Sequence, residues 1–156
     1  MLNSNAVKKI TLVNTEKFKN KNFLNILEKE KIDEKLKRND LDFSNCIIIN
    51  YDFSNHYNLK KAVFNNSHVI NCNFRSCDLR TLNDSCFDKC IFDKAGLEDG
   101  NLKNSFFKSC HFLGTYFTKA ECKNVTFLNC GITKKLLEES RIRDIFFLNI
   151  INLQKL

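Results

Sequence analysis

The sequence predicts an all-β solenoid built from square coils, and three features of the chain support this fold class. Within residues 105–132 a large apolar residue recurs every fifth position, at Phe107, Phe112, Phe117 and Phe127. The residue two positions before each of these four is small. The same period continues through most of the chain, which favours one repeating architecture.

A period of five fits neither an α-helix nor a flat strand. On a helix five residues advance by about 500°, so every fifth side chain points in a different direction. On a strand an odd step moves the side chain to the opposite face. A chain that turns a corner every five residues sends each central residue inward, and four corners close a coil of about twenty residues. Successive coils then stack at the strand spacing, roughly 4.8 Å.

The register of central residues contains eighteen units of five, or four and a half coils. A one-residue slip occurs at His56 and a three-residue insertion is expected within residues 81–85. The expected centres are Phe43, Ile48, Phe53, Leu59, Phe64, Val69, Phe74, Leu79, Phe87, Phe92, Leu97, Leu102, Phe107, Phe112, Phe117, Cys122, Phe127 and Ile132. Fifteen of the eighteen residues two positions before a centre are small, which suits a second inward position against a crowded wall.

Counting both irregularities as bulges assigns each centre to one of four stacked columns. One column is expected to contain Phe43, Phe64, Phe87, Phe107 and Phe127. Its neighbour is expected to contain Ile48, Val69, Phe92, Phe112 and Ile132. Stacked rings would then fill much of the interior.

The repeat units resemble the pentapeptide-repeat family, whose pattern is a small residue, then Asp or Asn, then Leu or Phe. The units that carry the resemblance are "AGLED" (95–99), "CNFRS" (72–76) and "CDLRT" (77–81). The resemblance covers residues 41–134 and implies a right-handed quadrilateral β-helix of four to five coils. Asp or Asn is often missing before the centre, as at Ile47, Ile91, Phe106 and Tyr116.

Three segments are expected. Residues 1–40 form a partly helical N-terminal capping segment, because residues 15–38 show helical apolar spacing. Residues 41–134 form the β-helix. Residues 135–156 form a helical C-terminal cap, because an open β-helix end exposes unpaired backbone. The apolar content of this tail favours a homodimer through the same end, as family members often form, with candidate contacts Ile145, Phe146, Ile150 and Ile151.

Composition predicts a soluble globular protein. The 156 residues suffice for a buried core, and 43% hydrophobic with 28% charged residues exclude a disordered chain. No apolar run approaches the roughly 20 residues of a membrane helix, and no secretory signal is recognised. Eight cysteines without a CxxC spacing indicate buried thiols in a reducing cytoplasm. Cys46, Cys90, Cys110 and Cys130 are expected to share one column, with Ser67 between them.

No motif for catalysis, cofactor binding or metal binding occurs in the sequence. The four glycines form no phosphate-binding loop, and neither HExxH nor GxSxG is present. His68 and His111 fall in one expected outward column, but Ile91 separates them by one coil. A gap of roughly 10 Å is too long for one metal ion. The chain is therefore predicted not to be an enzyme and to carry no cofactor or metal.

Two outer surfaces are candidates for binding. An apolar interaction face needs cover from the chain's own ends, a second copy or a partner. It comprises Ile47, Ile49, Ile70, Ile91, Phe106 and Leu113. An anion-facing row would repel itself unless Asp78 and Glu121 or an anionic partner answered it. It comprises Lys60, Arg80, Lys103 and Lys123.

Two functions are compatible with these features. The first is a non-catalytic scaffold or interaction protein that binds an unidentified macromolecular partner through the faces of the β-helix. The second follows from the resemblance alone, since some pentapeptide-repeat proteins protect or inhibit DNA gyrase or topoisomerase by imitating duplex DNA. Imitation of DNA needs an acidic rod, whereas residues 41–134 hold 11 basic and 9 acidic residues. The scaffold is therefore preferred, with neither membrane nor direct nucleic-acid binding expected.

Overall fold

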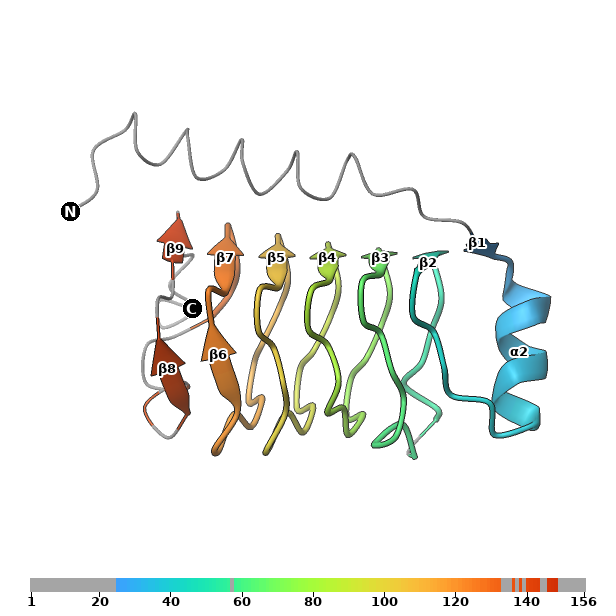
Figure 1. The fold of residues 1–156 in the computed structure, drawn as a ribbon, viewed down its shortest axis with the longest axis horizontal. Helices are drawn as coiled ribbons and strands as arrows, with labels where there is room; N and C mark the ends of the chain where they lie inside the picture. Colours follow the sequence, from blue (N-terminus) through green and yellow to red (C-terminus); the bar gives the residue numbers. More distant parts are fainter. Residues whose placement is uncertain are drawn as a thin grey trace.

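In a computed structural model, which describes residues 25–56, 58–132, 136, 138, 140–143 and 146–148, the chain winds into a parallel-strand β-solenoid (Figure 1). The described elements are β1 (Asn25–Leu27), α2 (Lys29–Lys37), β2 (Cys46–Ile49), β3 (His68–Ile70), β4 (Cys86–Asp88), β5 (Phe106–Lys108), β6 (Glu121–Lys123), β7 (Thr126–Leu128), β8 (Arg141–Arg143) and β9 (Phe146–Leu148). One parallel sheet has the order β1-β2-β3-β4-β5-β7-β9, and β6 pairs with β8 in another. The predicted all-β solenoid is confirmed.

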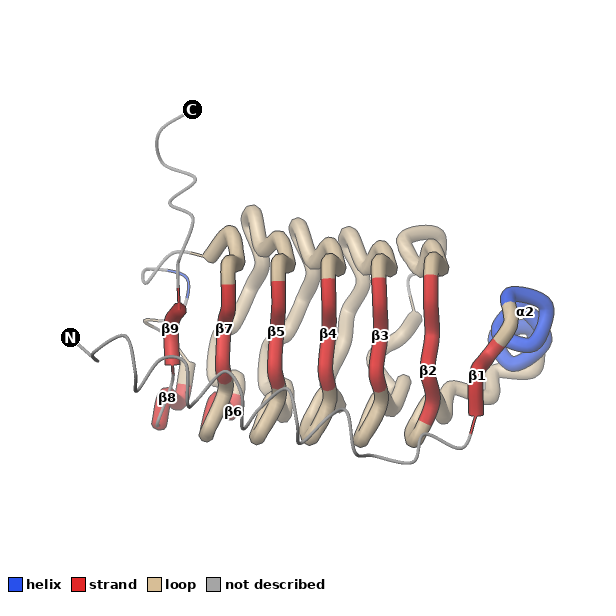
Figure 2. The backbone as a smooth tube through the Cα atoms, turned by 90° about the horizontal axis from the view of Figure 1, so that it is seen from above, coloured by secondary structure: helices blue, strands red, loops and turns tan. Residues whose placement is uncertain are grey.

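Each coil has four faces, and parallel bridges join the same face of successive coils. The first column of centres contains Phe43, Phe64, Leu82, Leu102 and Cys122. The second, on the long sheet whose strands Figure 2 shows face-on, contains Ile48, Val69, Phe87, Phe107 and Phe127. The third contains Phe53, Phe74, Phe92, Phe112 and Ile132. The fourth contains Leu59, Leu79, Leu97 and Phe117.

All eighteen predicted centres are buried, with at most 1% of the residue exposed, so the five-residue register is confirmed. The column assignment is wrong after residue 80. The expected three-residue insertion is instead a face shortened to three residues, because Leu82 is itself a fully buried centre. This placement keeps the backbone ladder intact, since Phe64 N–H donates to Thr81 O and Leu82 N–H donates to Asn101 O. Every later centre therefore belongs one column further on, and Phe87 stacks on Val69.

Stacked phenylalanine rings fill two of the columns. In the third column successive ring centroids of Phe53, Phe74, Phe92 and Phe112 are 4.8, 5.2 and 5.2 Å apart. Their planes differ by only 5–7°. Rings of the neighbouring second column meet them edge-on, as Phe87 meets Phe92 at 77°. Both arrangements are favourable for aromatic pairs, so the interior is an ordered aromatic lattice.

The corners of the coils use the left-handed backbone region. Most residues two positions after a centre have positive φ, such as Asn45 at 55°, Asn66 at 59° and Asn104 at 58°. Asn tolerates this conformation better than most residues, because its short amide bonds locally. Lys89 and Lys94 adopt it as well, at 57°. Their N–H groups each donate to the next coil, at 2.8 Å, which stabilises these corners.

Helix α2 covers the first coil, at the end of the solenoid (Figure 2). Its Ile32 is 1% exposed and belongs to the interior cluster. Tyr51 Oη donates a hydrogen bond to Asp33 Oδ1 at 2.6 Å, which joins the helix to the coil. Of the helix expected over residues 15–38, the described residues contain α2 over residues 29–37 and no helix over residues 25–27. Strand β1 precedes it and pairs with β2, and residues 1–24 lie outside the described residues.

The described part of the tail continues the solenoid instead of forming the expected helical cap. Strand β8 pairs with β6, with Arg141 opposite Glu121, and β9 pairs with β7, with Phe146 opposite Thr126. The next parallel strand satisfies backbone groups that a helix would leave unpaired at the open end. Of the candidate dimer contacts, Phe146 begins β9, whereas Ile145, Ile150 and Ile151 lie outside the described residues. The dimer stays a prediction.

In the described part of the chain no helix has the length and apolarity needed to cross a bilayer.

Candidate binding surfaces

The structure places four of the six predicted apolar face residues on one sheet. Ile47 and Phe106 share one outward row of the second column, in register with His68 and Cys86. Ile49 and Ile70 are paired in the other outward row. We call the outward surface of β1 to β7 in this sheet the sheet face. The remaining two residues, Ile91 and Leu113, lie around the corner beside the third column, because the short face at Leu82 moves them.

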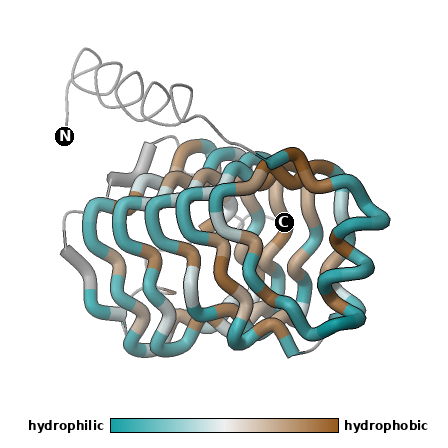
Figure 3. Tube along the Cα trace, turned by 45° about the vertical axis from the view of Figure 1, so that its right-hand side comes forward, coloured by the Kyte–Doolittle hydropathy of each residue, from teal (hydrophilic) through white to brown (hydrophobic). Residues whose placement is uncertain are grey.

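The sheet face has two halves that differ in exposure. Toward β1 it is open, since Ile26 is 65% and Ile49 is 47% exposed. Toward β7 it is closed, since the outward-facing Phe106 is only 2% exposed and Thr126 is 1% exposed. Phe106 packs there with Cys86 and the partly buried Leu128 in an apolar cluster separate from the interior. Exposed apolar surface on this sheet is therefore concentrated over β1 to β3. Figure 3 shows hydrophobic segments between hydrophilic corners along these coils.

Polar residues border the open half of the sheet face. Lys108 Nζ lies 3.1 Å from Asp88 Oδ2, in the outward row that Ile49 and Ile70 begin. Burial lowers the pKa of His68, an effect that the Asp88 carboxylate opposes. His68 and His111 do not share a column, because His111 bridges Ile91 beside the third column. The histidine column expected from the sequence is thus wrong.

The four residues of the predicted anion-facing row do not form one row. Lys60 and Arg80 lie on the fourth column, and Lys103 and Lys123 lie on the first, again because of the short face at Leu82. Three of the four have acidic neighbours: Lys60 Nζ–Asp78 Oδ2 is 3.8 Å, Arg80 Nη2–Asp99 Oδ2 is 3.9 Å, and Lys103 Nζ–Glu121 Oε2 is 2.5 Å. Asp78 and Glu121 therefore each lie beside one of these four cations, as one of the two alternatives from the sequence required. Such half-exposed pairs contribute little to stability.

The structure adds one basic residue that the sequence prediction missed. Arg141, at the start of β8, joins Lys103 and Lys123 around an open depression of about 510 Å³. The other lining residues are Asn104, Glu121, Cys122 and Asn124. The sequence predicts a helix for the tail, and a helix would not place Arg141 beside Lys103 and Lys123. The strand β8, paired with β6, brings Arg141 opposite Glu121.

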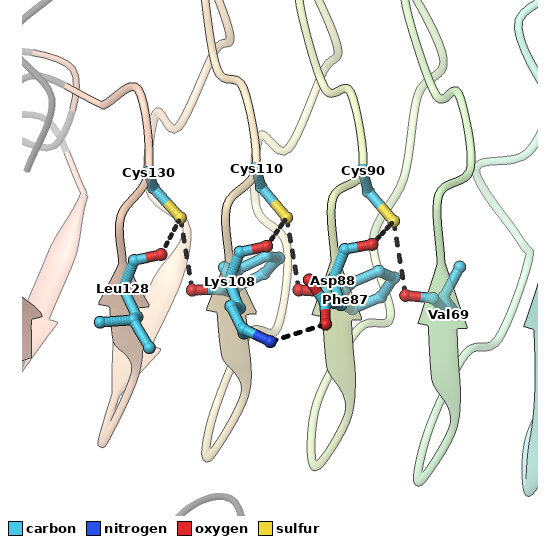
Figure 4. Close-up of polar contacts among 9 residues, drawn as sticks. Val69, Phe87, Asp88, Cys90, Lys108, Cys110, Leu128 and Cys130 are labelled. Atoms are coloured by element: carbon cyan, nitrogen blue, oxygen red, sulfur yellow. Dashed lines mark hydrogen bonds and ion pairs between the residues drawn. The ribbon is translucent and has the colours of Figure 1, made fainter. Parts of the chain in front are cut away.

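The cysteines form an interior column of their own. Cys72, Cys90, Cys110 and Cys130 lie two positions before successive centres of the third column, whereas Cys46 precedes the second column together with Ser67, Ser85 and Ser105. The predicted column was therefore wrong in two members, Cys46 and Ser67, and it lacked Cys72. In Figure 4 each labelled thiol reaches two carbonyl oxygens, and Cys110 Sγ is 3.3 Å from Phe87 O and 3.4 Å from Lys108 O.

Burial makes these thiols poor nucleophiles and poor metal ligands. It raises the pKa of Cys72 and of Cys77 to about 12, and that of Cys122 to about 11. All eight cysteines are free and buried, which confirms the predicted structural thiols. Among the described residues no three His, Cys, Asp or Glu side chains are grouped so that they could hold a metal ion.

Comparison with known proteins finds likeness in fold. No protein-family model and no curated protein sequence matches this chain. A trypsin-treated variant of QnrB1, described as a plasmid-mediated fluoroquinolone resistance protein, is 19% identical with a TM-score of 0.34. That match covers 81% of this chain and 64% of the QnrB1 chain, so this chain spans less than two thirds of it. The pentapeptide-repeat protein Rfr23 from the cyanobacterium Cyanothece 51142 is 13% identical with a TM-score of 0.36, over 77% of this chain and 98% of that one. The predicted resemblance to pentapeptide-repeat proteins agrees with the five-residue register of buried centres.

Proposed function

We propose that this protein is a non-catalytic repeat scaffold that binds a protein partner through the open half of its sheet face. The observation that supports this most is the exposure of Ile26 and Ile49, beside the half-buried Ile47 and Ile70. Isolated exposed apolar residues are ordinary, but a contiguous group on a sheet is typical of an interaction site. The partner would present apolar side chains to this group.

The architecture suits such a role because the binding residues stand on a stiff support. Ile49 and Ile70 occupy adjacent strands, and the interior centres behind them, Ile48 and Val69, are fully buried. The patch also has a polar border, formed by His68 and the Asp88–Lys108 pair. An apolar centre with a polar rim is the usual composition of a protein interface.

Imitation of DNA toward DNA gyrase or topoisomerase remains the second hypothesis. It requires carboxylates that are free to meet a basic surface. Several acidic side chains of the coils instead lie within 4 Å of a Lys or Arg nitrogen: Asp78, Asp88, Asp93, Asp99 and Glu121. With 11 basic against 9 acidic residues in residues 41–134, the charge favours the scaffold.

A comparative capture experiment tests the proposal. Proteins crosslinked to the native chain would be compared with those crosslinked to Ile49→Asp and to the control Leu113→Asp, whose native residue is 61% exposed on another face. We expect a partner that binds the native chain and Leu113→Asp alike and loses at least about tenfold in affinity for Ile49→Asp. Equal binding by all three chains would refute the assignment of the sheet face.

A DNA gyrase supercoiling assay tests the second hypothesis. Inhibition by the native chain at micromolar levels would favour imitation of DNA over the scaffold, and Lys103→Glu in the same assay would show the contribution of charge.

A further inference from the structure

We propose that the depression around Lys103, Lys123 and Arg141 binds a small anion that carries two or more phosphate groups. This site lies on the first column near β8, on a different face from the proposed partner surface. It is independent of the scaffold function, since neither Ile26 nor Ile49 lines it.

Stacking of the coils brings the three basic residues together. The bridge between Asn101 and Glu121 sets Lys103 and Lys123 at the same position of successive coils, roughly one strand spacing of 4.8 Å apart. The pairing of β6 with β8 then sets Arg141 opposite Glu121. Three cationic side chains that are far apart in the sequence therefore line one depression of about 510 Å³.

The balance of charge in the depression is positive. Among the described lining residues, Glu121 is acidic; it lies 2.5 Å from Lys103 Nζ and compensates part of the charge of the three cations. For Lys123 and Arg141 no acidic group within 4.0 Å occurs in the described parts of the chain. Cations that have no acidic neighbour among the described residues repel each other when they lie at one surface site, and a bound anion would relieve that repulsion.

The rim of the depression is fixed by a ladder of side-chain amides. Asn124 Nδ2 donates to Asn104 Oδ1 at 3.1 Å, and Asn104 Nδ2 donates to Asp84 Oδ1 at 3.0 Å. Both asparagines occupy left-handed corners, with φ of 58° at Asn104 and 54° at Asn124. The basic side chains therefore extend from an ordered backbone, which lowers the entropic cost of binding.

The donor set favours phosphate over other anions. A guanidinium group binds phosphate through two parallel hydrogen bonds, and an ammonium group supplies a compact point charge. The volume lies within the roughly 300–1,000 Å³ of small-molecule sites. Among the described lining residues Cys122 alone has an apolar character, and it is buried. A compact, highly charged ligand such as a diphosphate fits this lining better than an apolar one.

Calorimetric titration with inorganic pyrophosphate at low ionic strength tests the site. We expect saturable binding by the native chain and about tenfold weaker binding by Lys123→Gln and by Arg141→Gln. The matched control is Lys60→Gln, which removes one positive charge from a lysine paired with Asp78 on the fourth column. An equal loss in this control would mean that pyrophosphate senses only net charge, and the site would be refuted.

A variant with the opposite expected effect protects the test from misfolding. Glu121→Gln removes the carboxylate that pairs with Lys103, so we expect pyrophosphate to bind several-fold more tightly than to the native chain. Unchanged or weaker binding by Glu121→Gln, with native circular dichroism, would overturn the proposal. So would tighter binding of a short DNA duplex than of pyrophosphate, because that result would assign the phosphates to a nucleic-acid backbone. Ile49→Asp should bind pyrophosphate normally, which separates this site from the partner surface.

Discussion

Inside the coils every predicted centre between Phe43 and Ile132 is buried, whereas outside them two predicted surface groups are divided between different faces. The difference begins where two buried centres, Leu79 and Leu82, are only three residues apart. The pattern within five consecutive residues is enough to predict that a centre points toward the axis of the solenoid. Neighbours on the outer surface depend on the number of faces in all preceding coils. One miscounted face therefore leaves the interior prediction unchanged and moves every later surface residue to the next face.

The interior should respond most strongly to substitution. Phe92→Ala opens a cavity between Phe74 and Phe112, whose rings each lie 5.2 Å from that of Phe92, and we expect a loss of about 3–5 kcal/mol. Urea unfolding followed by circular dichroism measures it. The control Leu113→Ala removes a residue that is 61% exposed and should change stability by less than about 0.5 kcal/mol. Similar midpoints for the two variants would contradict the aromatic lattice.

The short face provides the sharpest test of the register. Leu82→Ala should cost about 2–5 kcal/mol if Leu82 is a centre, as its complete burial indicates. If residues 81–85 were instead a surface insertion, the cost would stay below about 0.5 kcal/mol. Thr81→Ala serves as the adjacent control, because its bridge to Asn101 uses backbone groups that the substitution keeps. Equal effects of the two substitutions would contradict Leu82 as a centre and would support the three-residue insertion expected from the sequence.

The residues around Leu82 explain why the sequence alone missed it. Two positions before a centre the chain normally has a small residue, but Arg80 precedes Leu82. The distance from Leu79 is also three residues and not five. Both local signals of the repeat are therefore absent where the coil shortens. Burial of Leu82 follows from the coils above and below it, which no five-residue pattern contains.

The helix predicted for the tail is replaced by strands β8 and β9 in the described residues, for a related reason. Ile142 and Phe147 come twenty residues after Cys122 and Phe127, and in the structure they are their partners. Ser140 even supplies a small residue before Ile142, but Ile145 breaks the pattern before Phe147. The many apolar residues of the tail favour a helix, and the five-residue repeat is interrupted at Ile145. A helix would not bring Arg141 opposite Glu121, so the sequence prediction does not include Arg141 among the basic residues of the depression.

Phe106 tests the boundary between interior and outer surface. It points outward from β5, yet it is 2% exposed, so Phe106→Ala should cost about 2 kcal/mol. That value lies between those for Phe92→Ala and for Ile49→Ala, whose native residue is 47% exposed and should contribute less than about 0.5 kcal/mol. Chemical unfolding of the three variants under one condition gives the order. A negligible effect of Phe106→Ala would mean that the closed half of the sheet face is open in solution.

The buried thiols of the interior should make the free energy of unfolding fall at alkaline pH. Burial raises the pKa of Cys72 to about 12 and of Cys122 to about 11, so the unfolded chain, with ordinary thiols near 9.0, ionises first. The free energy of unfolding should therefore be unaffected by these groups below about pH 8. It should fall as the pH rises above 9 and stop falling only beyond their folded pKa values. At pH 9.5 each thiol should account for about 1 kcal/mol of the loss. Urea midpoints of the native chain and of Cys72→Ala, compared at pH 7.5 and 9.5, measure this contribution. A native chain whose cysteines react with a thiol reagent at pH 8 as fast as those of the unfolded chain would contradict burial of the whole column.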